Sequence, residues 1–532
     1  MLMGLAIFSS DAFSQLSING GTLVIDSGAI VSVQGDVISD VNILGNGKLL
    51  MNGASAQSLN MNGNTLPAIE IDNAQHVSLV SAVRVGKNLS FTNGKLIAGN
   101  FDVTLAPGSS ISGSGSNKYI DINGTGQAIL ELDANVSDKL VPVGTNTTYR
   151  PAFVSSSATT YSNGKVGIRV VDSLHPNKPS RIANYLETYW PITKSGITGT
   201  VSVKGQYADP SDVVGMENKI RGYYYNGSEW SSVAHSKDWN ANLVGGPITG
   251  STGALYGMGK FIYVGPRACL QGAYNSVSGL MNENLRTPTL RLPNSDPYRL
   301  TAYSSSFVHV NNATIETVSG TPFASQTNSG DNIVDWVFLE LRNTNASPGN
   351  SVLQTRSALI QRDGDIVDVD GISPILFNDV EDGNYAITVR HRNHFSMSLN
   401  PTAGAVSMNE TKGDAYDARV VDLRRQSTAQ LFGDTLAYTR ANHPTLGTIK
   451  LMWGGNANAN ANARYSGAGN DRAVILSDLS NNELGVLNGY IRSDLNMNGA
   501  VRYSGANNDR SFLLSNVLEA NELKVRTEQR PN

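Results

Sequence analysis

The chain has 532 residues, of which 16% are charged and 40% are apolar, and its net charge is −4 at pH 7. A chain of this length is too long for one hydrophobic core, and it predicts several domains. The weakly acidic balance argues against a nucleic-acid partner. The single cysteine, Cys269, excludes an intrachain disulfide, so we expect sheet packing, bound metal ions or both to hold the domains together.

The first residues are typical of a secretory signal peptide, which we place at residues 1–14. A short apolar run, residues 2–8, precedes the small residues Ala12 and Ser14, whose spacing fits a cleavage site. The alternative is a buried N-terminal strand. No later stretch approaches the ~18 apolar residues that a membrane helix requires. We therefore predict an exported protein, extracellular or on the outer cell surface, without a transmembrane span.

From residue 15 to residue 140 the pattern is a series of short apolar runs with alternating polarity. Asn-Gly pairs, which favour tight turns, separate several of these runs, at Asn52-Gly53, Asn62-Gly63 and Asn93-Gly94. Short strands at such close spacing predict a β-solenoid, in which each rung stacks on the next. A β-sandwich is the alternative interpretation of this region.

Longer alternating strands follow, and they predict two β-sandwich domains at residues 141–266 and 267–425. The strand expected at 333–342 is apolar on both faces, which predicts a central position in its sheet. Three consecutive tyrosines at 223–225 also allow a sugar-stacking surface, because at least one must face outward. Further strands are expected at 165–171, 199–204, 260–264, 298–303 and 385–390.

The last part of the chain contains one unit twice. After a predicted linker at 426–448, the region 449–532 holds a motif that begins at Asn456 and again at Asp494. In each copy, oxygen-bearing side chains occupy alternate positions, a tight turn follows, and an apolar helical stretch comes next. This order is typical of a calcium loop.

The second copy has the stronger ligand set. Asp494, Asn496 and Asn498 occupy loop positions 1, 3 and 5, and Gly499 supplies the sharp turn. The usual closing carboxylate is replaced by glycine, so we expect Asp509, at the start of the following helix, to close the site. We predict a calcium ion here. The alternative is a metal-free Asx-rich turn with Asp509 as the helix N-cap.

The first copy has lost most of its charge. Its candidate ligands Asn456, Asn458 and Asn460 are neutral, Ala461 replaces the turn glycine, and Asp471 supplies the carboxylate. Low ligand charge weakens calcium binding. We predict that this copy is a metal-free structural twin, in which the four polar residues form at most a weaker set of ligands.

Two other polar clusters are not expected to form a metal site. The acidic residues at 363–370 are expected at a solvated hairpin tip, or in ion pairs with Arg390 and Arg392. On a strand, His391 and His394 would point to opposite faces and would not share a metal ion.

Several stretches carry a resemblance to a known kind of protein. They include 141–145 with 149–151, 270–274 with 278–281, 334–342, 356–365, 389–394, 494–499, 508–510 and 526–529. These stretches resemble large secreted surface proteins of Bacteroidota that are described as hemagglutinin-like or as type IX secretion cargo. The resemblance implies export, a surface role and a dockerin-like C-terminal repeat. Together with the strand patterns, this gives an expected fold class that is all-β and multidomain: a solenoid, two sandwiches and a dockerin-like tandem repeat at 449–532.

The sequence contains no nucleophile elbow and no phosphate-loop motif. We therefore predict a non-enzymatic adhesin or structural protein with a calcium-binding terminal module. The expected partners are a surface glycan, a protein ligand or further copies of the chain. Two alternatives stay open: an assembly module that docks to a cohesin-like partner or to itself, and a carbohydrate-binding or carbohydrate-active protein.

Overall fold

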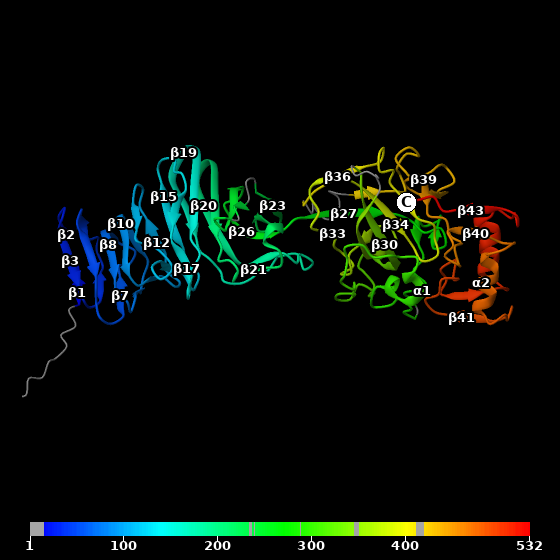
Figure 1. Cartoon of the computed structure of the whole chain (residues 1–532), viewed down its shortest axis with the longest axis horizontal. Coiled ribbons are helices and arrows are strands. Elements are labelled where there is room, and N and C mark those ends of the chain that lie inside the picture. The colour runs from blue at the N-terminus through cyan, green and yellow to red at the C-terminus, as the bar shows by residue number, and fades with distance from the viewer. Residues whose placement is uncertain are drawn as a thin grey trace, which may run out of the picture. The chain divides into compact units, whose positions relative to one another are not determined.

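The computed structural model describes residues 15–233, 237–238, 240–287, 289–344, 351–410 and 420–531. The predicted signal peptide at 1–14 lies outside these residues. The fold is all-β, as predicted, and separates into two compact units, Met1–Lys260 and Phe261–Asn532 (Figure 1). In the described residues no helix has the length and apolar character needed to cross a membrane.

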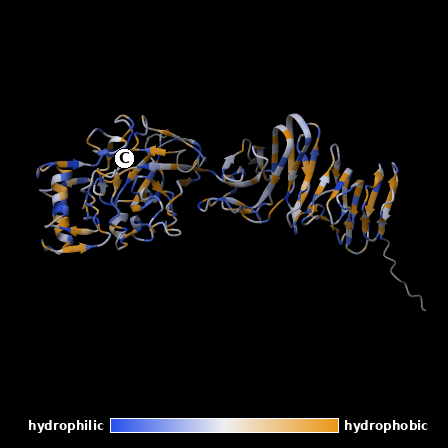
Figure 2. Cartoon of the chain, turned by 180° about the vertical axis from the view of Figure 1, so that it is seen from behind, coloured by the Kyte–Doolittle hydropathy of each residue, from blue (hydrophilic) through white to orange (hydrophobic). Residues whose placement is uncertain are grey.

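The first part of the first unit is solenoid-like, as predicted. Two ladders of parallel strands run through it, and apolar residues recur along their strands (Figure 2). Leu49, Ile69 and Leu89 pair in register on successive strands, and all three are fully buried. One ladder contains β1 (Leu16–Ile18), β4 (Val37–Ser39), β7 (Gln57–Asn60), β9 (Val77–Leu79), β11 (Leu96–Ile97), β14 (Ile120–Asp121) and β17 (Val143–Thr145); the other contains β3 (Ile30–Val33), β6 (Lys48–Met51), β8 (Thr65–Asp72), β10 (Val83–Asn93), β12 (Val103–Leu105) and β15 (Ala128–Leu132).

The sheet continues without a break past residue 140. The last parallel strand of the second ladder, β15, pairs antiparallel with β19 (Ala152–Ile168), which pairs in turn with β20 (Tyr185–Gln206). Because the backbone pairing is continuous, the rungs and the long strands share one sheet. The sheet is extended by β22 (Ile220–Tyr225), β23 (Trp230–Ser232), β25 (Leu243–Ile248) and β26 (Thr252–Gly259).

The aromatic residues of this region mainly fill its core. Tyr223 and Tyr224 are each 1% exposed, whereas Tyr225 is partly exposed. Tyr225 and Trp230 pack against the ring of His175 at 5.1 and 4.8 Å between centroids. Burial among these rings lowers the pKa of His175 to about 4, so it is a neutral core residue.

The second unit is built around β30 (Ile333–Asn343). It lies between β31 (Val352–Gln361) and β34 (Gly383–Arg390), and residues 333–342 are buried on both faces. The prediction of a central strand is therefore confirmed. The same sheet contains β32 (Ile366–Val367), β35 (Met397–Ser398) and β36 (Val406–Met408), and a second sheet contains β27 (Phe261–Arg267), β33 (Ile375–Asn378) and β37 (Val420–Asp422).

One strand prediction in this unit is wrong. Residues 298–303 form a 3-10 turn, η2 (Pro297–Arg299), followed by the short helix α1 (Thr301–Ser304). The Asp296 side chain accepts the backbone N–H of Tyr298 at 2.9 Å, and Pro297 occupies the first helical position. Both features favour the start of a helix, and they outweigh the alternating polarity of the segment.

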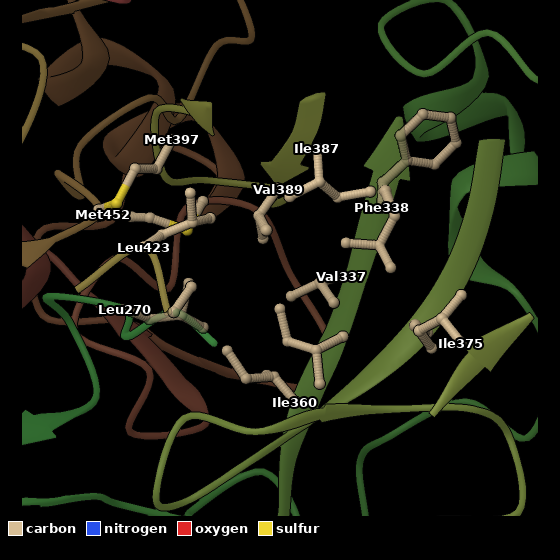
Figure 3. Packing of buried hydrophobic residues seen from close by; sticks show 14 of the residues in the cluster. Leu270, Val337, Phe338, Ile360, Ile375, Ile387, Val389, Met397, Leu423 and Met452 are labelled. Atoms are coloured by element: carbon tan, nitrogen blue, oxygen red, sulfur yellow. The ribbon is translucent and has the colours of Figure 1, made fainter. Parts of the chain in front are cut away.

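A single hydrophobic core joins these strands to later loops. One buried cluster contains Val337 and Phe338 of β30, Val389 of β34, Leu423 and Met452 (Figure 3). The core also includes Leu431, Ala437 and Tyr438, which lie within the predicted linker at 426–448. That segment is therefore part of the packed unit rather than a linker, because its apolar side chains are buried. It contains β38 (Thr439–His443) and the start of β39 (Gly447–Leu451), which pair as a hairpin.

The terminal repeat forms two similar halves that exchange strands. In the first half, β40 (Asn462–Arg464) precedes α2 (Asp471–Asp478) and β41 (Val486–Asn488). In the second half, β42 (Ala500–Arg502) precedes α3 (Asp509–Ser511), a π-helical turn η5 (Phe512–Val517) and β43 (Val525–Thr527). The loop strand of each half pairs with the closing strand of the other: β40 with β43 (Figure 1), and β42 with β41.

The π-helical turn has a sequence cause. Equivalent hydrogen bonds run from Ser504 Oγ to the carbonyl of Glu483 and from Ser466 Oγ to the carbonyl of Glu522. The chain from Asp509 to Glu522 is one residue longer than the equivalent chain from Asp471 to Glu483. A π turn absorbs a single extra residue without ending the helix. The two halves therefore keep the same strand exchange despite the insertion.

Candidate functional site

Each terminal loop is held by the carboxylate at the start of its helix. Asp509 Oδ1 accepts the backbone N–H groups of Leu495 and Asn496 at 2.7 and 3.3 Å, and Oδ2 accepts that of Arg502 at 2.8 Å. In the first loop, Asp471 accepts the equivalent N–H groups, those of Ala457, Asn458 and Arg464, at 2.7, 3.2 and 2.8 Å. The carboxylate thus fixes the curvature of both loops.

Asp509 is not the helix N-cap, contrary to the metal-free alternative. Asn508 takes that position, and its Oδ1 accepts the backbone N–H of Ser511 at 2.7 Å. Asn470 caps α2 in the same way. Because an asparagine satisfies the helix start, the carboxylate one residue later is free to turn back into the loop.

The remaining predicted ligands of the second loop lie together. Asp494 accepts the backbone N–H groups of Asn498 and Gly499 at 3.1 and 2.9 Å. The Nδ2 atoms of Asn496 and Asn498 both donate to the carbonyl oxygen of Asn507, at 2.8 and 3.0 Å. The structure therefore brings Asp494, Asn496, Asn498 and Asp509 into one compact loop, as their spacing predicts.

The first loop has the same hydrogen-bond pattern with one change. Asn458 and Asn460 donate through Nδ2 to the carbonyl oxygen of Gly469, at 2.6 and 3.2 Å. Asn456 occupies the position of Asp494, and its buried Oδ1 has no hydrogen-bond partner within the described ranges. The first loop is a close structural twin of the second, with one carboxylate in place of two.

The two carboxylates of the second loop are buried, and their pKa values are raised. Asp494 and Asp509 are both 0% exposed. Burial raises the pKa of each, and the charge of Asp494 contributes further to a pKa of about 8 for Asp509. Backbone N–H groups, rather than a cationic side chain, are the main groups that oppose the shift at Asp509. A divalent cation would relieve this repulsion, so the carboxylate pair fits calcium.

The amides of the same loop fit calcium less directly. Asn496 and Asn498 present nitrogen, not oxygen, toward the Asn507 carbonyl. Their Oδ1 atoms accept the backbone N–H groups of Asn498 and Ala500 at 3.1 and 2.9 Å. Among the described residues, no three His, Cys, Asp or Glu side chains gather as a metal-binding group. Calcium at this loop would therefore depend on amide or backbone oxygens beside the two carboxylates.

The two halves differ in the residue at the tight turn of the loop, and the effect of that difference on stability can be tested. Gly499 has φ +81°, as the predicted turn glycine requires, whereas Ala461 adopts φ +61° at the equivalent position. A side chain in this left-handed region costs about 1 kcal/mol. We expect Ala461→Gly to raise the free energy of unfolding by about 1 kcal/mol, measured by urea unfolding. Gly499→Ala should lower it; a stabilising Gly499→Ala change would contradict this explanation.

A second feature, which we call the arginine pocket, was not predicted. It is a cavity of about 450 Å³ in the second unit. Parts of 305–310, the end of β34, the first terminal loop and the segment 528–531 line it. Its charged lining residues are Arg342, Arg390, Arg392, Arg492, Arg530, Glu340 and Glu528.

A buried network anchors one wall of this pocket. Asp335 accepts hydrogen bonds from Arg392 Nε at 3.1 Å and from His391 Nε2 at 3.0 Å. His394 Nε2 accepts the backbone N–H of Gly272, so its proton resides on Nδ1, which lies 2.7 Å from Asn393 Oδ1. Burial lowers the pKa of both histidines, so both rings are neutral.

Two smaller expectations are corrected here. His391 and His394 do not point apart, because β34 ends at Arg390 and the chain turns; their Nδ1 atoms lie 3.1 Å apart. The acidic cluster at 363–370 does not pair with Arg390 or Arg392. Asp365 pairs with Arg267 and Asp368 with Arg356, because β31 and β27 bring those arginines to the cluster.

The comparisons with known proteins add no relative. No family model matches the chain, and searches of the curated proteins and of the solved structures likewise return no match. The case for a function therefore depends on the chemistry of the terminal loops and of the arginine pocket.

Proposed function

We propose that this chain is a non-enzymatic extracellular or cell-surface protein with an adhesive or structural role, and that its second terminal loop binds one calcium ion. The observation that carries the proposal is the buried carboxylate pair, Asp494 and Asp509, enclosed by one loop. An all-β, solenoid-like architecture supports a structural role, because stacked strands form long rigid surfaces.

In this proposal the two loops differ in the charge that they offer to calcium. Asp494 and Asp509 supply the negative charge that holds calcium, with amide oxygens of Asn496 and Asn498 and backbone oxygens completing the shell. The first loop keeps the same backbone but has Asn456 where the second has Asp494, so Asp471 is its single carboxylate. Calcium would therefore stiffen one half of the module, and the strand exchange would transmit that stiffness to the other half.

Calcium should raise the melting temperature of the full chain. Asp494→Asn together with Asp509→Asn should abolish most of the increase, because it removes both charges while keeping the side-chain shape. Asp471→Asn in the first loop is the matched control and should retain the increase. The measurement is differential scanning calorimetry with calcium and with chelator. An equal increase in the double variant would contradict the proposed site.

The effect should depend on pH in a defined direction. Without calcium, the raised pKa of Asp509, about 8, means that the folded state binds a proton more tightly than the unfolded state. Stability without calcium should therefore fall as pH rises from about 4 to about 8. Calcium binds the ionised form, so its stabilisation should increase over the same range. A calcium effect that decreases toward pH 8 would contradict this linkage.

A second candidate function, docking to a protein partner, is favoured by a specific observation. Leu484 and Leu523, at matching positions of the two halves, are 86% and 85% exposed, and Val486 and Val525 beside them are also exposed. Each half thus exposes an apolar pair at the same repeat position, Leu484 with Val486 and Leu523 with Val525, which a repeated contact surface would explain. We assign this surface to a cohesin-like protein partner. Pull-down with the full chain should lose that partner in Leu484→Asp with Leu523→Asp.

Glycan binding and enzymatic activity need a separate test. The full chain should bind members of a glycan array without releasing reducing ends from them. Release of sugar from any common polysaccharide would contradict the non-enzymatic proposal and favour the carbohydrate-active alternative.

A further inference from the structure

The arginine pocket carries an excess of positive charge. Five arginines line it against two glutamates, Asp335 balances Arg392 from behind the wall, and its two histidines, His391 and His394, are neutral, so positive charge remains in excess. Arginine guanidinium groups gathered around a cavity are the usual recognition elements for carboxylate, sulfate and phosphate groups. The lining therefore has the charge of an anion site.

The internal ion pairs do not use all of the donors. Arg390 donates Nη1 to Glu340 Oε1 at 2.9 Å and Nη2 to the Ser306 carbonyl at 2.6 Å, while its buried Nε has no hydrogen-bond partner among the described residues. Arg392 donates Nε to Asp335, while its Nη2 likewise has no partner in the part of the chain that the structure describes. A buried donor without a partner costs about 1–3 kcal/mol. These two guanidinium groups are thus fixed in place with unused hydrogen-bonding capacity.

Two further arginines are more accessible. Arg530 has a side chain that is 37% exposed, and its Nε lies 3.6 Å from Glu528 Oε2, too far for a strong charged hydrogen bond. Arg492 is partly exposed and donates Nη2 to the carbonyl of Ala302. Burial first, and then the charge of Arg530, lower the pKa of Arg390 against the opposing effect of Glu340. An anion between these groups would relieve the repulsion.

The pocket also has an apolar side. Phe307 lies against the Arg390 guanidinium at 4.6 Å. Val308 and Val310, on the same segment, also line the pocket, and Val308 is 66% exposed. The volume of about 450 Å³ falls within the ~300–1,000 Å³ of small-molecule sites. A bare inorganic ion would fill little of this space. The lining instead matches an organic anion with a body to pack against the valines.

We propose that the arginine pocket binds a carboxylate-bearing ligand of about monosaccharide size, a sugar acid, with its carboxylate held by Arg530 and Arg492 and stabilised by Arg390. The site goes beyond the proposed calcium loop and does not depend on calcium binding at Asp494 and Asp509. It places ligand recognition in the second unit, at the junction of β34 with the terminal repeat.

The test is isothermal titration of the full chain, without calcium, with three sugar acids: glucuronate, galacturonate and N-acetylneuraminate. Glucose is the control for an uncharged sugar ring, and inorganic sulfate is the control for negative charge without a sugar ring. At least one sugar acid should bind saturably, whereas glucose should not bind. Arg530→Gln and Arg492→Gln should each weaken that affinity about tenfold. Arg425→Gln, which removes an exposed arginine outside the pocket, should leave it unchanged.

Three outcomes would overturn the proposal. They are failure of all three sugar acids to bind, sulfate binding tighter than the best sugar acid, and unchanged affinity in both pocket variants. Because the Arg530 side chain is partly exposed, its variant should fold normally, and an unchanged circular dichroism spectrum checks this. A negative result here leaves the calcium proposal standing, since the calcium titration uses a different loop and different variants.

Discussion

Replacing Asp335 with alanine should lower the free energy of unfolding of the second unit by about 3–5 kcal/mol. Asp335 is 0% exposed and Arg392 is 1% exposed. The carboxylate accepts hydrogen bonds from Arg392 Nε, His391 Nε2 and the backbone N–H of Trp336. Its removal leaves a buried guanidinium without its counter-charge, which is among the most costly single changes in a protein interior.

The pH dependence of this contribution follows from the same contacts. Burial would raise the pKa of Asp335, but the charge of Arg392 and the hydrogen bond from His391 hold it below its usual value. The stabilisation is therefore present at neutral pH and is lost as pH falls through the lowered pKa. Urea unfolding of the full chain measures both effects.

The control for Asp335 is an exposed ion pair in the same unit. Glu519 is 60% exposed and pairs with Lys524 and Arg526. Glu519→Ala should cost less than about 1 kcal/mol, because water screens the pair. Equal losses for Asp335→Ala and Glu519→Ala would contradict the view that the buried network anchors the pocket wall.

Phe338→Ala should be the other large loss, about 3–5 kcal/mol. Phe338 is 0% exposed on the central strand β30 (Figure 3). Its ring lies 5.5 Å from the Tyr298 ring and 5.4 Å from the Phe307 ring. The substitution removes apolar contacts and leaves a cavity where close-packed strands cannot collapse. Phe338→Leu, which fills much of the same volume, should cost far less.

The variant has a second consequence for the arginine pocket. Phe307 packs against the Phe338 ring at 5.4 Å and against the Arg390 guanidinium at 4.6 Å, and that guanidinium also lies 5.7 Å from the Phe338 ring. A cavity at Phe338 would loosen that segment. We expect Phe338→Ala to weaken sugar-acid binding as well as folding, measured by the same titration. Retention of full core stability in Phe338→Ala would contradict the packing described for β30.

The elements with strong local signals were predicted from sequence. The alternation that predicts stacked short strands appears as in-register pairs such as Leu49 with Ile69, and the doubly apolar segment 333–342 is the central strand β30. The spacing of Asp494, Asn496 and Asn498 likewise placed them in one loop with Asp509. In each case residues near in sequence determine the geometry.

The failures have a common physical cause, which is contact between distant segments. The segment 426–448 resembles a linker by composition, but Tyr438 is buried because the core of the preceding sheet covers it. The pocket combines Arg390 with Arg530 and with the first terminal loop, and its only local signal is the run Arg390-His391-Arg392. The strand exchange and the π turn depend on pairing between the two halves, which no local pattern specifies.

The most direct test of the central claim is the stoichiometry of calcium binding, measured by isothermal titration of the chelator-treated full chain. We predict one ion per chain, lost in Asp509→Asn and retained in Asp471→Asn. Binding of no ion, or of two ions with equal loss in both variants, would contradict the assignment of calcium to Asp494 and Asp509.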